Sequence, residues 1–296
     1  KISPKAKVLI IQHTFGNPAN LVELLKIAHQ HGLFVIEDCA HALGAEYEGL
    51  KVGTFGDASF FSFGRDKVIS AVFGGALTVQ DHGLNRKIEV LEKEMPEATR
   101  GWVFQQIIHP ILMLKAKLTY DFFGLGKVLM KFYAMLGILS KAVYPEERFG
   151  RKPRFIGHRM PNALAVMAGH QFRKLERFNQ HRRELAKLYS AEIKADKFGS
   201  FAEQKGSQSI FLRYTIRSPE AGKIISDAKK HKLYLGDWYT TPIAPKDVNY
   251  KAVGYELLTC PNAEILAKET VNLPTHIGIS KQDAHRIVNY LNHYGN

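Results

Sequence analysis

The first forty residues alternate between short apolar runs and one amphipathic stretch, and this pattern constrains the fold most strongly. Residues 7–12 read KVLIIQ and residues 33–36 read LFVI, while the apolar residues of the segment 20–31 recur at helical spacing. A strand, a helix and a strand at these distances form a βαβ unit, whose two strands run parallel. Apolar runs at 58–63 and 74–79 are expected to add two more strands. The sequence therefore predicts an α/β fold with a mostly parallel sheet.

Polar residues stand where two of these strands should end, which is the edge of a parallel sheet where ligands bind. Asp38 follows the second apolar run, Ser62 lies near the end of the third, and Lys67 comes after a short turn that contains Gly64. A pyridoxal-phosphate (PLP) enzyme needs a lysine, an acid to keep the pyridine nitrogen protonated, and donors for the phosphate. Taken singly, an acid at a strand end is more often a turn residue, and a loop lysine is more often solvated.

The order and surroundings of these residues carry a specific resemblance. Residues 37–81 read EDCAHALGAEYEGLKVGTFGDASFFSFGRDKVISAVFGGALTVQD, which resembles the central block of the DegT/DnrJ/StrS-type sugar aminotransferases. Further segments look like other parts of the same family, namely HTFGNPANL, RMPNALAVMAGHQFRKLERFNQHRRELAKLY, GDWYTTPIAP and NLPTHIGIS. The resemblance covers nearly the whole chain except residues 91–150.

This resemblance implies a fold type I PLP enzyme in which four residues have assigned roles. Asp38 would pair with the pyridinium nitrogen, His41 would lie near the phenolic oxygen of the cofactor, and Ser62 would donate to its phosphate. Lys67 would be the Schiff-base lysine and would also move the proton during catalysis. The implied reaction is transamination of a keto sugar, which we expect to be nucleotide-linked, with an amino acid donor such as glutamate, in a homodimer. The lysine favours transamination, since some relatives with histidine there dehydrate their substrates instead.

The sequence also departs from the family pattern. Gly64 and Gly157 stand where relatives have a histidine and a phosphate-binding asparagine, so Arg65 or His158 is expected to supply the missing phosphate contact. The substrate-binding residues that we predict are His13, Tyr239 and His158. The chain opens on an apolar strand without the glycine-containing phosphate loop that precedes it in the family, and we expect these 296 residues to be a fragment of a longer protein.

Residues 102–144 do not resemble the family. They are apolar on most helical faces but contain five lysines and Pro110, which argue against a membrane-spanning helix. Over residues 102–154 there are nine basic and three acidic side chains, so the net charge is 9 − 3 = +6. Such a segment suits either a membrane surface or a helical hairpin in a dimer interface. Of these two, we expect the dimer interface.

Three domains are expected: a partial PLP-binding large domain over 1–100, an apolar and basic helical insertion over 101–152, and a small α+β domain over 153–296. The net charge of +13 comes without a zinc-finger spacing or a basic region followed by heptads, so we expect no nucleic-acid partner and no metal site. Cys39 and Cys260 form no disulfide framework, which suits the cytoplasm, with peripheral membrane contact through 102–144 as an option. Two other functions stay open: an inactive or regulatory relative, and a membrane-surface aminotransferase for a lipid-linked sugar.

Overall fold

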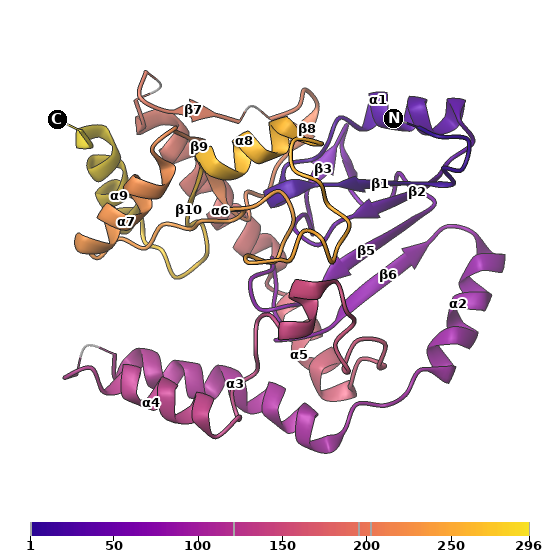
Figure 1. The fold of residues 1–296 in the computed structure, drawn as a ribbon, viewed down its shortest axis with the longest axis horizontal. Helices are drawn as coiled ribbons and strands as arrows, with labels where there is room; N and C mark the ends of the chain where they lie inside the picture. The colour runs from indigo at the N-terminus through magenta and orange to yellow at the C-terminus, as the bar shows by residue number, and fades with distance from the viewer. Residues whose placement is uncertain (1, 121, 195, 202, 296) are drawn as a thin grey trace.

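The computed structural model describes residues 2–120, 122–194, 196–201 and 203–295. Its N-terminal part contains a four-stranded sheet with the order β1-β2-β5-β6, in which β1, β2 and β5 are parallel and β6 is antiparallel. This mixed, mostly parallel sheet confirms the predicted α/β fold (Figure 1). The elements of this part are β1 (Val8–Gln12), the 3-10 turn η1 (Thr14–Gly16), α1 (Leu21–Gln30), β2 (Phe34–Asp38), β3 (Glu46–Tyr47), β4 (Leu50–Lys51), β5 (Ala58–Ser62), β6 (Gly75–Val79) and α2 (His82–Glu94).

The sequence pattern overestimated the burial of β1. Ile11 is buried, but Val8 and Ile10 on alternate positions are exposed, because β1 is an edge strand and no described segment covers that face of it. The βαβ unit itself forms as predicted: Asn20 caps α1 by accepting a hydrogen bond from the backbone N–H of Glu23, and the helix leads directly into β2.

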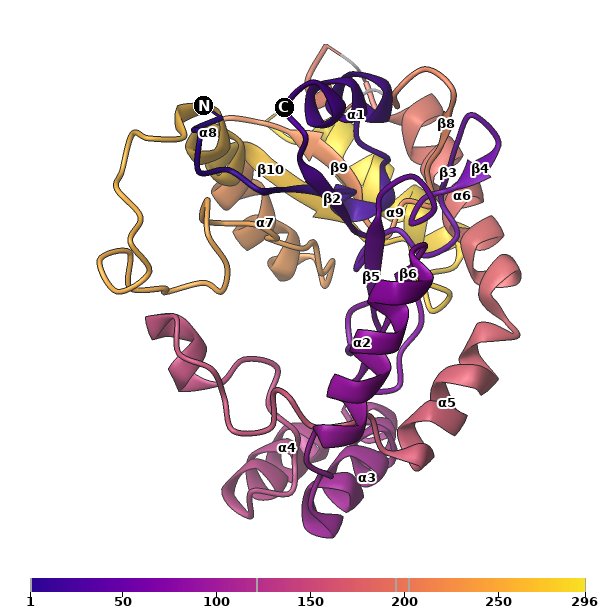
Figure 2. The same ribbon diagram turned by 90° about the vertical axis from the view of Figure 1, so that its right-hand side faces the viewer.

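Two helices follow the sheet and form an antiparallel hairpin. They are α3 (Arg100–Leu118) and α4 (Leu125–Met135), and a 3-10 turn, η2 (Pro145–Phe149), comes after them. Figures 1 and 2 both place this hairpin at the end of the molecule opposite α1. No helix among the described residues is long and apolar enough to cross a membrane.

The C-terminal part has a second core around an antiparallel sheet with the order β10-β9-β7. Its elements are α5 (Asn162–Phe172), α6 (Leu175–Glu192), β7 (Gly199–Ser200), β8 (Ser207–Gln208), β9 (Tyr214–Arg217), α7 (Ala221–Lys230), α8 (Pro261–Glu269), β10 (Thr270–Leu273) and α9 (Lys281–His293). The sequence predicts a last helix over residues 281–293, and α9 has these bounds. The sequence also predicts one long helix over residues 163–189, but the structure has two, because the chain makes a tighter turn at Arg173 and Lys174, where neither glycine nor proline signals a break.

The C-terminal part also contributes to the first core. Strand β8 pairs with β3, and Ile210 and Leu212 are buried among the side chains that pack against the N-terminal sheet. The apolar run over residues 210–216 predicts a strand from Ile210, but the strand begins at Tyr214, since residues 210–213 cross from one core to the other. This crossing brings residues near 213 beside the carboxyl ends of the parallel strands.

Candidate active site

The carboxyl ends of the parallel strands meet at one edge of the sheet. The register pairs Gln12 at the end of β1 with Asp38 at the end of β2, and Asp38 with Phe60 of β5. The side chain of Gln12 donates to Asp38 Oδ2 over 3.1 Å, and the backbone N–H of Ala40 donates to Asp38 Oδ1 over 3.0 Å. The carboxylate of Asp38 is thus held in a fixed orientation while the residue stays half-buried.

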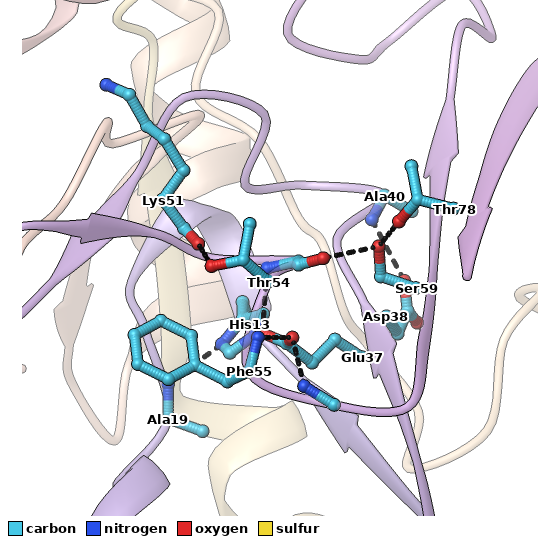
Figure 3. Close-up of polar contacts among 12 residues, drawn as sticks. His13, Ala19, Glu37, Asp38, Ala40, Lys51, Thr54, Phe55, Ser59 and Thr78 are labelled. Atoms are coloured by element: carbon cyan, nitrogen blue, oxygen red, sulfur yellow. Dashed lines mark hydrogen bonds and ion pairs between the residues drawn. The ribbon is translucent and has the colours of Figure 1, made fainter. Parts of the chain in front are cut away.

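The neighbouring carboxylate, Glu37, points to the other side of β2 and is completely buried (Figure 3). It accepts hydrogen bonds from His13 Nε2 (3.1 Å) and from three backbone N–H groups, those of Gly53 (2.8 Å), Phe55 (2.7 Å) and Gly56 (2.8 Å). Burial alone would raise the pKa of Glu37, but these four hydrogen bonds outweigh it and hold that pKa below its ordinary value. Glu37 therefore ties the chain at residues 53–56 to the sheet.

His13 belongs to this buried network. The residue is fully buried, its Nε2 contacts Glu37, and its Nδ1 accepts the backbone N–H of Ala19 over 3.1 Å. Ligand atoms of His13, Glu37 and Cys39 lie within 4.8 Å of one another, but the hydrogen bonds already made by the imidazole and the carboxylate account for the grouping. Both ring nitrogens of His13 are therefore already hydrogen-bonded and would have to give up a partner to contact a substrate as predicted.

Lys67 lies in the loop after β5, on the Asp38 side of the sheet. Its Nζ is 5.5 Å from the centroid of the Trp238 ring. Burial lowers the pKa of Lys67, and the charge of Arg213 lowers it further, while the carboxylates of Asp38 and Asp66 partly offset this. A lysine whose pKa is lowered is neutral for more of the time, and its amine is correspondingly more nucleophilic.

A group of stacked aromatic rings lies beside Lys67. The His41 ring stacks on Phe15 at 5.8 Å and on Trp238 at 5.5 Å, and Tyr239 stacks on His41 at 6.2 Å. Burial, with smaller contributions from Lys67 and Arg213, lowers the pKa of His41 to about 3, so the ring is neutral at ordinary pH. His41 Nδ1 accepts the backbone N–H of Phe15 over 3.3 Å, which leaves the proton on Nε2.

The loop that carries Lys67 is fixed from two directions. Arg182 of α6 is buried and donates to the backbone oxygen of Val68 over 2.8 Å and to Asn179 over 3.1 Å. On the other side, the guanidinium of Arg65 donates to the backbone oxygens of Ser140 and Lys141, just after the helical hairpin. The position of the Lys67 loop therefore depends on both the C-terminal part and the segment that follows the helical hairpin.

A cavity of about 610 Å³ adjoins the site between η1 and the C-terminal part. Gln12, Phe15 and Tyr239 line it, so it opens beside Asp38 and the aromatic group. Of the described residues that line the cavity, Arg213 alone carries a charge. The cavity can accept a largely uncharged molecule that presents one anionic group.

Some of the predicted site residues lie together, whereas others form contacts elsewhere. Asp38, His41, Lys67 and Tyr239 lie together: Lys67 and Asp38 interact electrostatically, His41 stacks on Tyr239, and burial with the charge of Asp38 raises the pKa of Tyr239 to about 12. Ser62 ends β5, and its Oγ accepts the backbone N–H of Gly64 over 3.3 Å.

Two further predicted residues are engaged elsewhere. Arg65 is directed to the carbonyl groups after the hairpin, and His158 Nδ1 contacts the backbone oxygen of Phe155 over 2.9 Å. A phosphate contact by either residue would use a donor that the structure already occupies or a group that has to turn, so this role stays a prediction.

Sequence reasoning missed Arg213, Trp238 and Gln12. Trp238 directly precedes Tyr239 and could have been selected with it, because an aromatic pair in a loop is unusual outside a core. Gln12 is the last residue of the first apolar run, at the same sheet edge as Asp38. Arg213 has no such signal, since only the crossing of residues 210–213 between the two cores brings it to the site.

Comparison with solved structures places this geometry in a known class. The fold matches that of an aminotransferase, TlmJ from Streptoalloteichus hindustanus, with a TM-score of 0.69 at 20% identity over 99% of this chain and 66% of that chain. Structures of this kind are fold type I PLP-dependent aminotransferases, so the predicted fold type is confirmed.

The sequence defines the family. A model of the DegT/DnrJ/EryC1/StrS aminotransferase family matches residues 1–119 and 130–292, and the chain belongs to this family. It is 25% identical over 308 residues to the GDP-perosamine synthase of Vibrio cholerae, with 100% of this chain and 68% of that protein covered. It is 27% identical over 295 residues to an uncharacterized protein of Methanocaldococcus jannaschii, covering 97% of this chain and 67% of that protein. The chain spans about two thirds of the length of the relatives it matches.

Proposed function

We propose that the protein transfers an amino group from an amino acid to a nucleotide-linked keto sugar with PLP as its cofactor. One observation carries this proposal: Lys67, a lysine with a lowered pKa, lies beside Asp38 at the carboxyl edge of the parallel sheet. Membership of the aminotransferase family supports the reaction class, and the similarity to a GDP-perosamine synthase supports a nucleotide sugar as substrate.

The residues of the site fit PLP. Asp38 presents an oriented carboxylate, and His41 presents an Nε2–H from a neutral ring. The Ser62 oxygen accepts from the backbone N–H of Gly64, so its O–H can donate to a ligand. Gly64 leaves space, since a Cβ there would lie 3.4 Å from Ser62 Oγ and 3.7 Å from Lys67 Cγ. When bound, PLP delocalises the electron pair that stays on the substrate carbon after its proton is removed.

Each residue then has a task that its surroundings support. Asp38 would hold a proton on the pyridine nitrogen, His41 would donate to the phenolic oxygen, and Ser62 would donate to the phosphate. Lys67 would hold the cofactor covalently at rest, and as a neutral amine it would take the proton from the substrate carbon and return it. His13 lies on the opposite side of β2, where we assign it to orienting Glu37 rather than to the substrate.

Arg213 would bind the amino acid donor. It lines the cavity beside Tyr239, and a carboxylate there would gain a charge-assisted hydrogen bond in a partly desolvated place. Glutamate is such a donor. The homodimer and the cytoplasmic location expected from the family stay predictions, which the native mass and fractionation of the protein test.

The assignment is tested by substituting the lysine. With PLP present, Lys67→Ala should lose the near-visible absorbance of covalently held cofactor and should lose transamination by at least about a thousandfold. Borohydride should fix the cofactor to the peptide that contains Lys67 in the unsubstituted protein. Lys51→Ala, which removes an exposed lysine of the same part of the chain, is the matched control and should keep both properties.

Two results would contradict the proposal. Borohydride labelling of a different lysine would remove Lys67 from its role. Cofactor held on Lys67 without transamination of any nucleotide keto sugar would favour a regulatory relative instead.

A further inference from the structure

The helical hairpin carries apolar stripes on its exposed surface. On α3 the large apolar residues at successive spacings of three and four positions are exposed: Phe104, Ile107, Ile111, Leu114 and Leu118. On α4 the same spacing recurs among exposed residues: Leu125, Val128, Phe132 and Met135. A spacing of three and four residues keeps each set on one face of its helix.

The turn between the helices extends this apolar surface. Phe123 is 96% exposed, Leu118 is 76% exposed and Phe122 is 65% exposed. These side chains lie at the end of the hairpin, where the rings of Phe122 and Phe123 contact each other but are largely open to solvent. Contiguous apolar surface of this extent is rare on a monomer unless it binds something.

The hairpin does not need these stripes for its own packing. Leu112 and Ala116 on the other face of α3 are buried, and Gly126 of α4 approaches so closely that a Cβ there would lie 2.1 Å from the backbone oxygen of Ala116. The side chain of Gln105 donates to the backbone oxygen of Gly137 over 2.7 Å and closes the hairpin further along. The exposed stripes are therefore free for a partner.

Charge identifies the partner. Lys115, Lys117, Lys127 and Lys131 lie on the two helices, and within the described chain none of them has an acidic partner within 4.0 Å. From residue 100 to residue 143 the sequence has six basic side chains and one acidic one. A second copy of the hairpin would bring like charges together, whereas an anionic lipid surface complements both the lysines and the stripes.

We propose that the α3–α4 hairpin docks on an anionic membrane surface, with the stripes and the tip in the boundary between head groups and acyl chains. The sequence alone favoured a protein interface, but four lysines without a described acidic partner lie on the same two helices as the exposed stripes, and this charge favours an anionic surface over a second copy. Arg65, two residues before Lys67, binds the carbonyl groups of Ser140 and Lys141, so the docked hairpin is attached to the loop of the active site.

Vesicle flotation tests the docking with the purified protein. Protein should float with vesicles in which phosphatidylglycerol replaces about one third of phosphatidylcholine, and it should float far less with pure phosphatidylcholine. Replacing the four lysines 115, 117, 127 and 131 by glutamate should lower the partition coefficient at least about a hundredfold, since each lysine near such a surface contributes roughly fivefold.

A matched variant separates placement from net charge. Glutamate at Lys26, Lys187, Lys229 and Lys268, four exposed lysines outside the hairpin, changes the total charge equally and should keep most of the binding. Leu118→Ser with Phe123→Ser should lower binding at least about tenfold without loss of folding, because both side chains are already exposed. Thermal unfolding of each variant checks that the fold is retained.

Three flotation results would overturn the proposal. They are equal flotation with neutral and anionic vesicles, equal losses in the two lysine variants, and no flotation of the unsubstituted protein. If lipid-free protein instead forms dimers that Leu118→Ser with Phe123→Ser dissociates, the stripes bind a second copy and the membrane proposal is wrong.

Discussion

The two carboxylates that end β2 differ in almost everything except their chemistry. Glu37 is completely buried and accepts four hydrogen bonds, from the His13 side chain and from three backbone N–H groups. Asp38 is half-buried, is oriented by Gln12 and Ala40, and lies close enough to Lys67 for the two charges to interact. Two adjacent residues of one strand therefore differ: Glu37 stabilises the fold, whereas Asp38 belongs to the candidate active site.

The difference follows from strand geometry. Successive side chains of a strand point to opposite faces, so a Glu-Asp pair at a strand end must supply one carboxylate to each side of the sheet. On the Glu37 side every donor is in place before any ligand arrives. On the Asp38 side the carboxylate interacts with Lys67 and is hydrogen-bonded to Gln12, which lines the cavity, and its remaining acceptor capacity is available to a ligand.

The largest effect should come from the buried side. Glu37→Ala removes the partner of His13 and leaves three buried or partly buried backbone N–H groups without this acceptor, so the free energy of unfolding should fall by about 3–5 kcal/mol. Asp38→Ala should cost far less stability, because that residue is half-buried. Urea unfolding of the two variants measures the contrast, and equal losses would mean that the two sides of β2 do not differ as described.

On the Asp38 side the expected effect is on rate. Asp38→Asn keeps the shape of the side chain and the hydrogen bond to Ala40, but it cannot hold a proton on the pyridine nitrogen. Under the proposed function, transamination should slow by roughly a hundredfold or more, which is about 3 kcal/mol in the barrier. Cofactor binding, measured by titration, should change much less. A variant with nearly normal turnover would exclude Asp38 from the reaction.

Much of the fold could be predicted because the signals were local. Apolar runs and helical spacing gave the βαβ unit and the last helix, Lys281–His293. The short helix Pro261–Glu269 and the strand after it were missed, since their mixed composition shows no clear period. The exposed face of β1 was missed for another reason: an apolar run does not reveal whether anything covers it.

The candidate site was predictable where the chain order encodes it. Asp38, His41, Ser62 and Lys67 lie within thirty residues, and a single sheet edge brings them together. Arg182 and Arg213 come from distant helices and loops, and no local pattern marks a buried arginine that holds the oxygen of Val68 or lines a cavity. Such residues depend on how two cores pack, which spacing along the chain does not encode.

His41 lies in the aromatic group of the candidate site, but its contribution to the free energy of unfolding should depend on pH. Its pKa is about 3 in the folded protein and near 6.5 when unfolded, so the unfolded state binds the extra proton first. Its contribution to stability is complete above pH 6.5 and is lost as the pH falls toward 3. At pH 5 the loss should be about 2 kcal/mol, at 1.4 kcal/mol per pH unit.

His41→Gln should remove this loss, because glutamine does not titrate. The measurement is urea unfolding of the variant and the unsubstituted protein at pH 7 and pH 5. The gap between them should shift in favour of His41→Gln at the lower pH. Parallel curves at both pH values would show that His41 is not the neutral, buried histidine that the aromatic group implies.

The smallest effect should be that of the Arg213 charge on the pKa of Lys67, which is separate from the proposed binding of the amino acid donor. Burial is the main cause of the lowered pKa of Lys67, and the positive charge of Arg213 adds to it. Arg213→Gln removes that charge, so the pKa of Lys67 should rise and the pH at which it becomes a neutral amine should move upward. Covalent attachment of PLP, followed by absorbance across a pH series, should therefore need a higher pH in the variant. Asp66→Asn is the opposite test, since the Asp66 carboxylate raises the pKa of Lys67, and its attachment profile should move to lower pH. If both substitutions moved the profile in the same direction, a structural change rather than charge would be responsible, and the electrostatic account of the Asp38 side would fail.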